Sequence, residues 1–337
     1  MNGKETPVTR IDADGTAHVA RVVPVPRTVS PAAQQFLATP PWGGATPVPP
    51  GTPLWKLRAA LDAGLRMIGE MAQAHYGVGV EEMQVGGVRC HLVRPGGGAG
   101  RARGRVLINL HGGGFVVGSG SLVEAIPIAA LTGIPVIAVD YRLAPEHPFP
   151  AAVDDVVAVY REVLGHREAR AVGIYGASAG GFLTAQAAVR LEREGLPLPG
   201  CLGVFTAGGD FGDFGDSAQI FGLNGFWGEL VTPLDAPHSE VRAYLGGADP
   251  MNPLVSPLHA DLSRFPPTLL VTGTRDALLS TTCILHRALR RAGATAELFV
   301  FEAMPHAHWY SFHLPEAQEA LAVMTDFFAR HTATVEA

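Results

Sequence analysis

The sequence predicts an α/β protein built around a mostly parallel sheet. From about residue 87 onward, short apolar and β-branched runs alternate with segments of helical periodicity, which is typical of successive βα units. The chain has 337 residues, of which 47% are hydrophobic and 17% are charged, so it can fill a large core. One large α/β domain with an appendage fits this length.

Strands and helices should alternate through the larger, C-terminal part of the chain. Seven segments have the length and composition of strands: Val88 to Val93, Arg105 to Leu110, Pro135 to Asp140, Ala171 to Tyr175, Gly200 to Thr206, Thr268 to Thr272 and Glu297 to Phe301. Five segments between and after them have helical patterns: Leu122 to Leu131, Ala152 to Leu164, Gly180 to Glu194, Thr281 to Arg291 and Pro315 to Arg330.

Three segments fall outside this alternation. The first 55 or so residues are rich in proline, which excludes a continuous helix or a central strand, and we expect an arm that wraps around the domain. Leu54 to Tyr76 then repeats apolar residues at spacings of three and four, which predicts an amphipathic helix. Gly208 to Leu245 is rich in glycine and bulky aromatics, and we interpret it as an insertion that packs with this helix.

Composition excludes several classes of partner. With 25 Lys and Arg against 31 Asp and Glu, the net charge of −6 argues against a nucleic-acid partner. No stretch reaches the roughly 18 apolar residues of a membrane span, and the polar N-terminus lacks a signal core, so we expect a cytoplasmic protein without a membrane partner. Cys90, Cys201 and Cys283 lack the spacing of metal ligands, which predicts free thiols.

A serine motif follows one of the predicted strands. The run Gly-Ala-Ser-Ala-Gly at 176–180 matches G-x-S-x-G, the tight turn that lifts a serine above the end of a sheet. The apolar strand Ala171 to Tyr175 leads into it and a helix begins directly after it, so Ser178 is the predicted nucleophile. Ser217 lies in a similar run, but Gln219 replaces the second glycine and no strand precedes it.

A glycine-rich loop could stabilise negative charge beside that serine. His-Gly-Gly-Gly at 111–114 follows an early strand, and glycines let backbone N–H groups approach an oxyanion. A phosphate loop would require Gly-Lys-Ser/Thr or G-x-G-x-x-G, which the loop lacks. The predicted oxyanion hole is formed by the N–H groups of Gly113, Gly114 and Ala179, with His111 orienting the loop.

The acid and the base should follow the serine in the chain. Asp276 lies just beyond the strand Thr268 to Thr272, where its carboxylate can reach the cleft of Ser178. Two imidazoles follow the next strand, and we favour His306 over His308 as the base because it comes first beyond the strand end. A metal site formed by the two histidines lacks a third clustered ligand.

Other polar residues have architectural interpretations. Asp140, Asp154 and Asp155 precede the serine, so the expected order excludes them as the acid. Tyr141 to His147 is interpreted as a loop whose ions pair with one another and brace the cleft. His147 itself is expected at the surface or beside the site.

These motifs together resemble the hormone-sensitive-lipase-like family of α/β-hydrolase esterases. The resemblance covers roughly residues 85 to 330 and rests on these segments: HGGGF at His111 to Phe115, YRLAPEHPFPAA at Tyr141 to Ala152, GASAGG at Gly176 to Gly181, Ser256-Pro257, Phe265 to Thr268, the Asp276 region and His306. It implies an eight-stranded, mostly parallel sheet with helices on both faces. It also implies an N-terminal arm and cap helices over residues 1–84 and a catalytic domain over residues 85–337, with a cap insertion around 208–245.

The resemblance also implies Ser178, Asp276 and His306 as a catalytic triad. Two departures leave this triad intact: Ala177 stands where the family usually has Asp, and His308 stands where an aromatic or glycine is commoner. Ala177 is not itself a reactant, so we expect altered local hydrogen bonding rather than inactivity.

The expected function is a serine carboxylic ester hydrolase that acts through an acyl-enzyme on small, short- to medium-chain acyl esters, without a cofactor or metal. The acyl pocket should be bounded by cap aromatics, including Trp42, Trp55, Phe221 and Trp227. A non-catalytic binding homologue is the alternative from another class, but such homologues, like the plant hormone receptors of this family, lack the base. A lactonase, amidase or peptidase is not separated by the motifs, and the sequence leaves open whether the chain forms a homodimer.

Overall fold

An eight-stranded sheet lies at the centre of the computed structural model, which describes residues 9–19, 23–39, 53–96, 104–220 and 239–334. The strand order is β10-β9-β8-β7-β5-β6-β4-β3. The strands are β3 (Gly79–Val85), β4 (Val88–Arg94), β5 (Val106–Leu110), β6 (Val136–Val139), β7 (Val172–Ala177), β8 (Cys201–Phe205), β9 (Thr268–Gly273) and β10 (Ala296–Phe301). Neighbours from β10 to β6 are parallel, whereas β4 pairs antiparallel with β6 and β3. The predicted mostly parallel α/β sheet is therefore confirmed.

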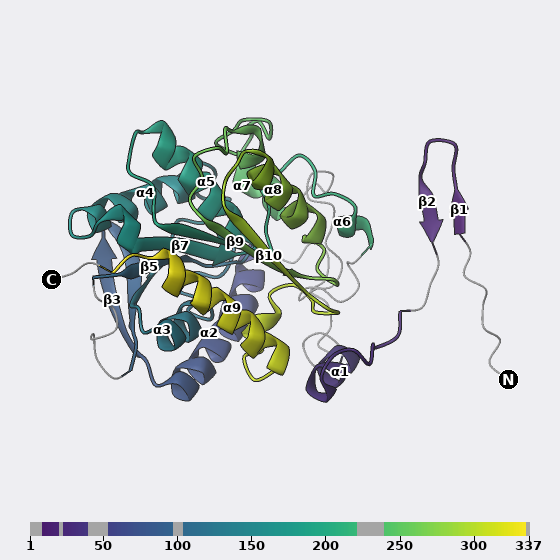
Figure 1. Cartoon of the computed structure of the whole chain (residues 1–337), viewed down its shortest axis with the longest axis horizontal. Helices are drawn as coiled ribbons and strands as arrows, with labels where there is room; N and C mark the ends of the chain where they lie inside the picture. Colours follow the sequence, from purple (N-terminus) through teal and green to yellow (C-terminus); the bar gives the residue numbers. More distant parts are fainter. Residues whose placement is uncertain (1–8, 20–22, 40–52, 97–103, 221–238, 335–337) are drawn as a thin grey trace.

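Helices cover both faces of this sheet (Figure 1). The described helices are α1 (Pro31–Ala38), α2 (Leu54–Tyr76), α3 (Ala125–Thr132), α4 (Ala151–Leu164), α5 (Ala179–Arg193), α6 (Ser217–Ile220), α7 (Glu240–Leu245), α8 (Leu279–Arg291) and α9 (Pro315–His331). The helices α4, α5 and α8 share one apolar cluster with the sheet, while α3 and α9 share a second cluster on the opposite face.

Strand β5 shows how the sequence divides between these two clusters. Val106, Ile108 and Leu110 belong to the cluster of α4 and α5, whereas Leu107 belongs to the cluster of α3 and α9. Successive side chains of a strand point to opposite faces, so a strand covered on both sides is apolar along most of its length. This is the pattern from which the central strands were predicted. The one polar residue of β5, Asn109, is buried and donates a hydrogen bond to Glu124.

Strand β3 is the one strand of this sheet that the sequence analysis missed. It forms the edge of the sheet, pairs along its whole length with β4, and exposes several of its side chains. Only one face of such a strand is covered, so its sequence, Gly-Val-Glu-Glu-Met-Gln-Val, lacks the continuous apolar run that marked the other strands.

Part of the N-terminal arm contacts the α/β body. Pro24 accepts a 2.9 Å hydrogen bond from the side chain of Arg275, and Ser30 caps α1 while its hydroxyl donates to Glu316 of α9. The short hairpin of β1 (Thr9–Ile11) and β2 (Ala17–Val19) lies apart from the body (Figure 1). Among the described residues of the expected arm, the contacts with the domain therefore come from residues 23–39 and not from the hairpin.

The described ends of the predicted insertion are α6 and α7. Val241 of α7 and Leu57 of α2 pack against the same apolar cluster. Trp42, Phe221 and Trp227, which were expected to bound the acyl pocket, lie outside the described residues. The division into an arm with cap helices and a catalytic domain remains a prediction. Among the described helices, none is both long and apolar enough to span a membrane.

Helix α2 is tied to two loops at the end of the sheet where the serine motif lies. Its Arg58 pairs with Glu146 at 2.6 Å and donates to the carbonyls of Val116 and Ala144. The Arg58 guanidinium lowers the pKa of Glu146 to about 2. One helical turn later, Asp62 accepts a hydrogen bond from the N–H of Gly118.

The loop Tyr141 to His147 differs from its prediction. Glu146 pairs with Arg58 of α2, and Arg142 pairs with Asp155 of α4, so the ions bind other elements rather than one another. The sequence could not show this because both partners are brought to the loop by the packing of α2 and α4. The loop still serves as a brace, since it joins those two helices.

A buried carboxyl group lies at the start of α3. Glu124 is almost fully buried, and it accepts hydrogen bonds from the hydroxyl of Tyr310 at 2.5 Å and from the amide of Asn109 at 3.3 Å. Burial raises the pKa of Glu124 from 4.5 to about 7. The folded chain therefore holds this proton at pH values where an unfolded chain has lost it.

This carboxyl should make the free energy of unfolding depend on pH. As pH rises from 4.5 to about 7, the unfolded chain ionises Glu124 before the folded chain does, so stability falls across this window and stays lower above it. The shift corresponds to a loss on the order of 3 kcal/mol. The measurement is urea unfolding of the wild type and of Glu124→Gln at pH 5 and at pH 8. Between these two pH values, the variant should lose less unfolding free energy than the wild type, by about this amount. Equal losses in the two proteins would refute the raised pKa of Glu124.

Candidate active site

Ser178 occupies a sharp turn between β7 and α5. Its backbone has φ +56° and ψ −124°, a conformation that residues with a side chain rarely adopt, and its N–H donates to the carbonyl of Phe205 at 2.9 Å. The turn places the hydroxyl at the carboxyl end of β7 and at the N-terminus of α5. The helix terminus favours negative charge that develops nearby.

The glycines of the motif are required by the neighbouring strand. A Cβ atom at Gly180 would lie 1.8 Å from the carbonyl oxygen of Leu110, and one at Gly176 would lie 2.2 Å from the same oxygen. Leu110 ends β5, the strand next to β7. The turn therefore packs directly on β5, and a side chain at either position would force the two elements apart.

His306 and Asp276 form a hydrogen-bonded pair beside the serine. The imidazole Nδ1 lies 3.0 Å from Asp276 Oδ1. The carboxylate is fully buried and also accepts hydrogen bonds of 2.9 Å from the Thr272 hydroxyl and from the backbone N–H of Leu278. With Nδ1–H donated to the carboxylate, the second nitrogen of His306 is left as the acceptor.

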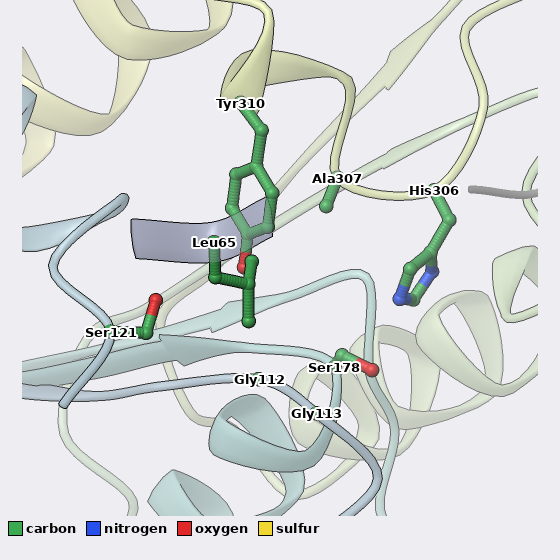
Figure 2. A pocket seen from close by; sticks show the side chains of 8 residues that line it. All are labelled: Leu65, Gly112, Gly113, Ser121, Ser178, His306, Ala307 and Tyr310. Carbon is green, nitrogen blue, oxygen red and sulfur yellow. The ribbon is translucent and has the colours of Figure 1, made fainter. Parts of the chain in front are cut away.

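His306 and Ser178 line the same pocket, and Figure 2 shows the imidazole and the serine hydroxyl facing each other across it. Asp276 follows β9, His306 follows β10, and Ser178 follows β7, so parallel strands deliver all three to one edge of the sheet. The structure thus brings together the three residues that the sequence singled out.

Thr206 is a further contact of the imidazole that the sequence analysis missed. Its hydroxyl lies 2.9 Å from His306 Nδ1, and it is buried at φ +44° directly after β8. No motif marked it. Its only signal in the sequence is its place after a buried strand that pairs with β7 and β9.

The glycine-rich loop passes close to Ser178. A Cβ atom at Gly112 would lie 3.4 Å from Ser178 Cβ. Gly113 and Gly114 have φ values of +122° and +58°, and a Cβ at Gly113 would lie 2.2 Å from the carbonyl of Val117. The tight path therefore requires glycine and leaves the backbone open toward the serine.

The predicted role of His111 in orienting this loop is supported by its contacts. Its ring stacks on Tyr141 with centroids 4.2 Å apart, and its Nδ1 donates to the carbonyl of Gly112 at 2.7 Å. The hydroxyl of Tyr141 in turn donates to the carbonyl of His111. Burial lowers the pKa of His111, so the ring stays neutral.

The less favoured candidates, His308 and Ser217, lie in other environments. His308 is buried between the rings of Phe301 and Trp309, and burial lowers its pKa to about 4. Ser217 donates to the carbonyl of Ala277 and accepts from the N–H of Ser280, so its hydroxyl is engaged in holding α6.

Three more polar residues either have other partners or lie at the surface. Asp140 binds Arg89, the hydroxyl of Ser119 and the N–H of Gly120. Asp154 pairs with Arg190, and His147 is exposed.

The pocket also contains side chains that no motif indicated. Leu65 of α2, Ser121 and Tyr310 line it together with the serine, the imidazole and the glycine loop (Figure 2). Trp55, which was expected to bound the acyl pocket, is 67% exposed and is not among the residues that line this pocket, so its role stays a prediction.

Comparisons with known proteins agree with this arrangement. Residues 107–310 match the model of a protein family with the alpha/beta hydrolase fold. The acetyl-hydrolase of Streptomyces hygroscopicus is 34% identical over 293 residues, which are 84% of this chain and 94% of the relative.

Solved structures show the same likeness over most of the chain. The crystal structure of esterase E25 matches with a TM-score of 0.81 at 34% identity, covering 93% of this chain and 98% of that one. A hormone-sensitive lipase from a metagenome library matches with a TM-score of 0.75 at 31% identity, covering 85% and 94%. The chain therefore belongs to the α/β-hydrolase family, in its hormone-sensitive-lipase-like branch of esterases.

Proposed function

We propose that Ser178, His306 and Asp276 are the catalytic triad of a serine carboxylic ester hydrolase. The observation that carries this proposal is the hydrogen bond between a buried carboxylate and an imidazole that faces the strained serine across one pocket. Ester hydrolysis is also the activity named for the acetyl-hydrolase and esterase relatives. A purely binding homologue would have no need of this pairing.

The geometry supports acyl transfer in two steps, the formation of an acyl-enzyme and its hydrolysis. His306 accepts the proton of the Ser178 hydroxyl while the oxygen attacks the ester carbonyl, and the imidazolium then gives this proton to the departing alcohol. Water, activated by the same imidazole, attacks the acyl-enzyme and releases the acid. Asp276 fixes the tautomer of His306 and stabilises its positive charge throughout.

Negative charge on the carbonyl oxygen needs donors that are already in place. We assign the N–H groups of Gly113, Gly114 and Ala179, because the glycine loop passes beside Ser178 and Ala179 begins α5. Each such donor contributes about 3–4 kcal/mol to transition-state stabilisation in comparable sites.

The position of His306 indicates where the alcohol and the acyl group of an ester would lie in the pocket. The leaving alcohol must lie within reach of His306 to receive its proton, so the acyl group lies on the other side of Ser178. In Figure 2 this side is occupied by Leu65, Ser121 and Tyr310. Leu65 is almost fully buried and takes up space on this side of the pocket, which supports short acyl groups as substrates.

Removal of the nucleophile should abolish hydrolysis. With 4-nitrophenyl esters from acetate to palmitate, Ser178→Ala should lose at least about a thousandfold in kcat/KM, because no acyl-enzyme can form. The matched control is Ser217→Ala, which removes a serine that does not line the pocket. Equal rates for wild type and Ser178→Ala would remove this serine from the mechanism.

The two neighbouring imidazoles should differ in what they contribute. His306→Ala should lose at least about a thousandfold in kcat, since Ser178 then lacks its base. His308 is buried and has its pKa lowered to about 4, so it does not titrate with activity near neutral pH. His308→Ala should instead lose about 1–3 kcal/mol of unfolding free energy. If only His308→Ala is inactive while both variants fold, the assignment of the base is wrong.

The pocket should accept longer acyl chains when the side chain of Leu65 is shortened. In Leu65→Ala, the ratio of kcat/KM for 4-nitrophenyl hexanoate to that for the acetate should rise about five- to tenfold, because the removed side chain leaves room for added methylenes. Leu61→Ala is the control, since it shortens a side chain of the same helix that does not line the pocket. An unchanged ratio in Leu65→Ala would place the acyl chain elsewhere.

A further inference from the structure

The acyl side of the pocket contains a hydroxyl group that lacks a partner. Ser121 is only 7% exposed, and its side chain lines the pocket. Its backbone N–H bonds to Gly118, but among the described residues its hydroxyl makes no hydrogen bond. Its oxygen is not sealed inside the protein, so it can pair with a ligand group that enters the pocket.

A second hydroxyl, that of Tyr310, lies in the same pocket. Tyr310 extends into the pocket in Figure 2, and its hydroxyl donates to Glu124 at 2.5 Å. Because its proton is directed at this carboxyl, the phenol oxygen faces the pocket as an acceptor.

The phenol oxygen of Tyr310 lies where the first carbons of an acyl group would be. A Cβ atom built on Gly112 would lie 3.4 Å from Tyr310 Oη and also 3.4 Å from Ser178 Cβ. The phenol oxygen is therefore within twice this distance of the serine. An acyl chain attached to Ser178 reaches this region with its second or third carbon.

We propose that the pocket selects short acyl groups that carry a hydroxyl on the second or third carbon. The substrate hydroxyl donates to Tyr310 and accepts from Ser121, and a plain alkyl chain leaves Ser121 unpaired. This inference rests on the proposed ester hydrolase function and on the placement of the acyl group away from His306. A site built to pair a substrate hydroxyl discriminates against the analogue that lacks it.

The test compares esters that differ by one oxygen atom. Ethyl butyrate is compared with each enantiomer of ethyl 3-hydroxybutyrate, and ethyl propionate with each enantiomer of ethyl lactate, by titration of the released acid. The leaving alcohol is ethanol in every case, so only the acyl side varies. For at least one pair, the wild type should favour the hydroxy ester about three- to tenfold in kcat/KM.

Two variants connect this preference to the pocket. Ser121→Ala and Tyr310→Phe should each lower the ratio of hydroxy to plain ester about threefold or more, mainly by slowing the hydroxy ester. Ser119→Ala is the matched control: it lies two residues away on the same loop, is exposed, and bonds to Asp140 instead. It should keep the wild-type ratio.

The outcomes separate this inference from the function on which it rests. If the wild type favours the plain ester in both pairs, or if Ser121→Ala keeps the wild-type ratio, the hydroxyacyl pocket is overturned. Hydrolysis of ethyl butyrate that is lost in Ser178→Ala would still establish the ester hydrolase. If neither kind of ester is hydrolysed in a Ser178-dependent manner, both proposals fall.

Discussion

The close contact between the serine turn and the end of β5 is the constraint on which the site depends. The backbone at Gly176 and Gly180 touches the carbonyl of Leu110, so the turn that carries Ser178 and the loop that follows β5 cannot separate. The same contact holds Ser178 in a strained conformation and keeps the glycine loop within van der Waals reach of it. Backbone packing thus positions the proposed nucleophile and the proposed oxyanion donors relative to each other.

The acid and base are positioned by a different means. Asp276 is fully buried, and a buried carboxylate is tolerated only where hydrogen bonds replace its hydration. Thr272 and the N–H of Leu278 meet this need within the loop of Asp276 itself, while Thr206 contacts the imidazole from β8. The orientation of His306 therefore depends on strands β8, β9 and β10 keeping their register.

The sequence predicted those features that depend on short, local stretches of residues. The central strands, the turn at Ser178 and the glycine loop are short runs whose residue types are dictated by burial on both faces or by close backbone approach. Asp276 and His306 followed from the order of residues along parallel strands. By contrast, Leu65, Ser121 and Tyr310 come from three separate elements, and nothing in their local sequence shows that they meet. The partners of Arg142 and Glu146 were mispredicted for the same reason, since helix packing decides them.

Helix α2 lies outside the sheet in the chain, yet it supplies Leu65 to the pocket wall. Arg58 and Asp62 fasten it to the loops at the edge of the sheet, largely through backbone carbonyls and an N–H that any sequence in those loops would offer. The part of the pocket wall that α2 supplies is therefore encoded in a separate stretch of the gene from the proposed reacting groups. Substitutions in the helix can change which acyl groups fit the pocket while the reaction stays the same. Members of such a family can therefore diverge in substrate specificity without changes to the reacting residues.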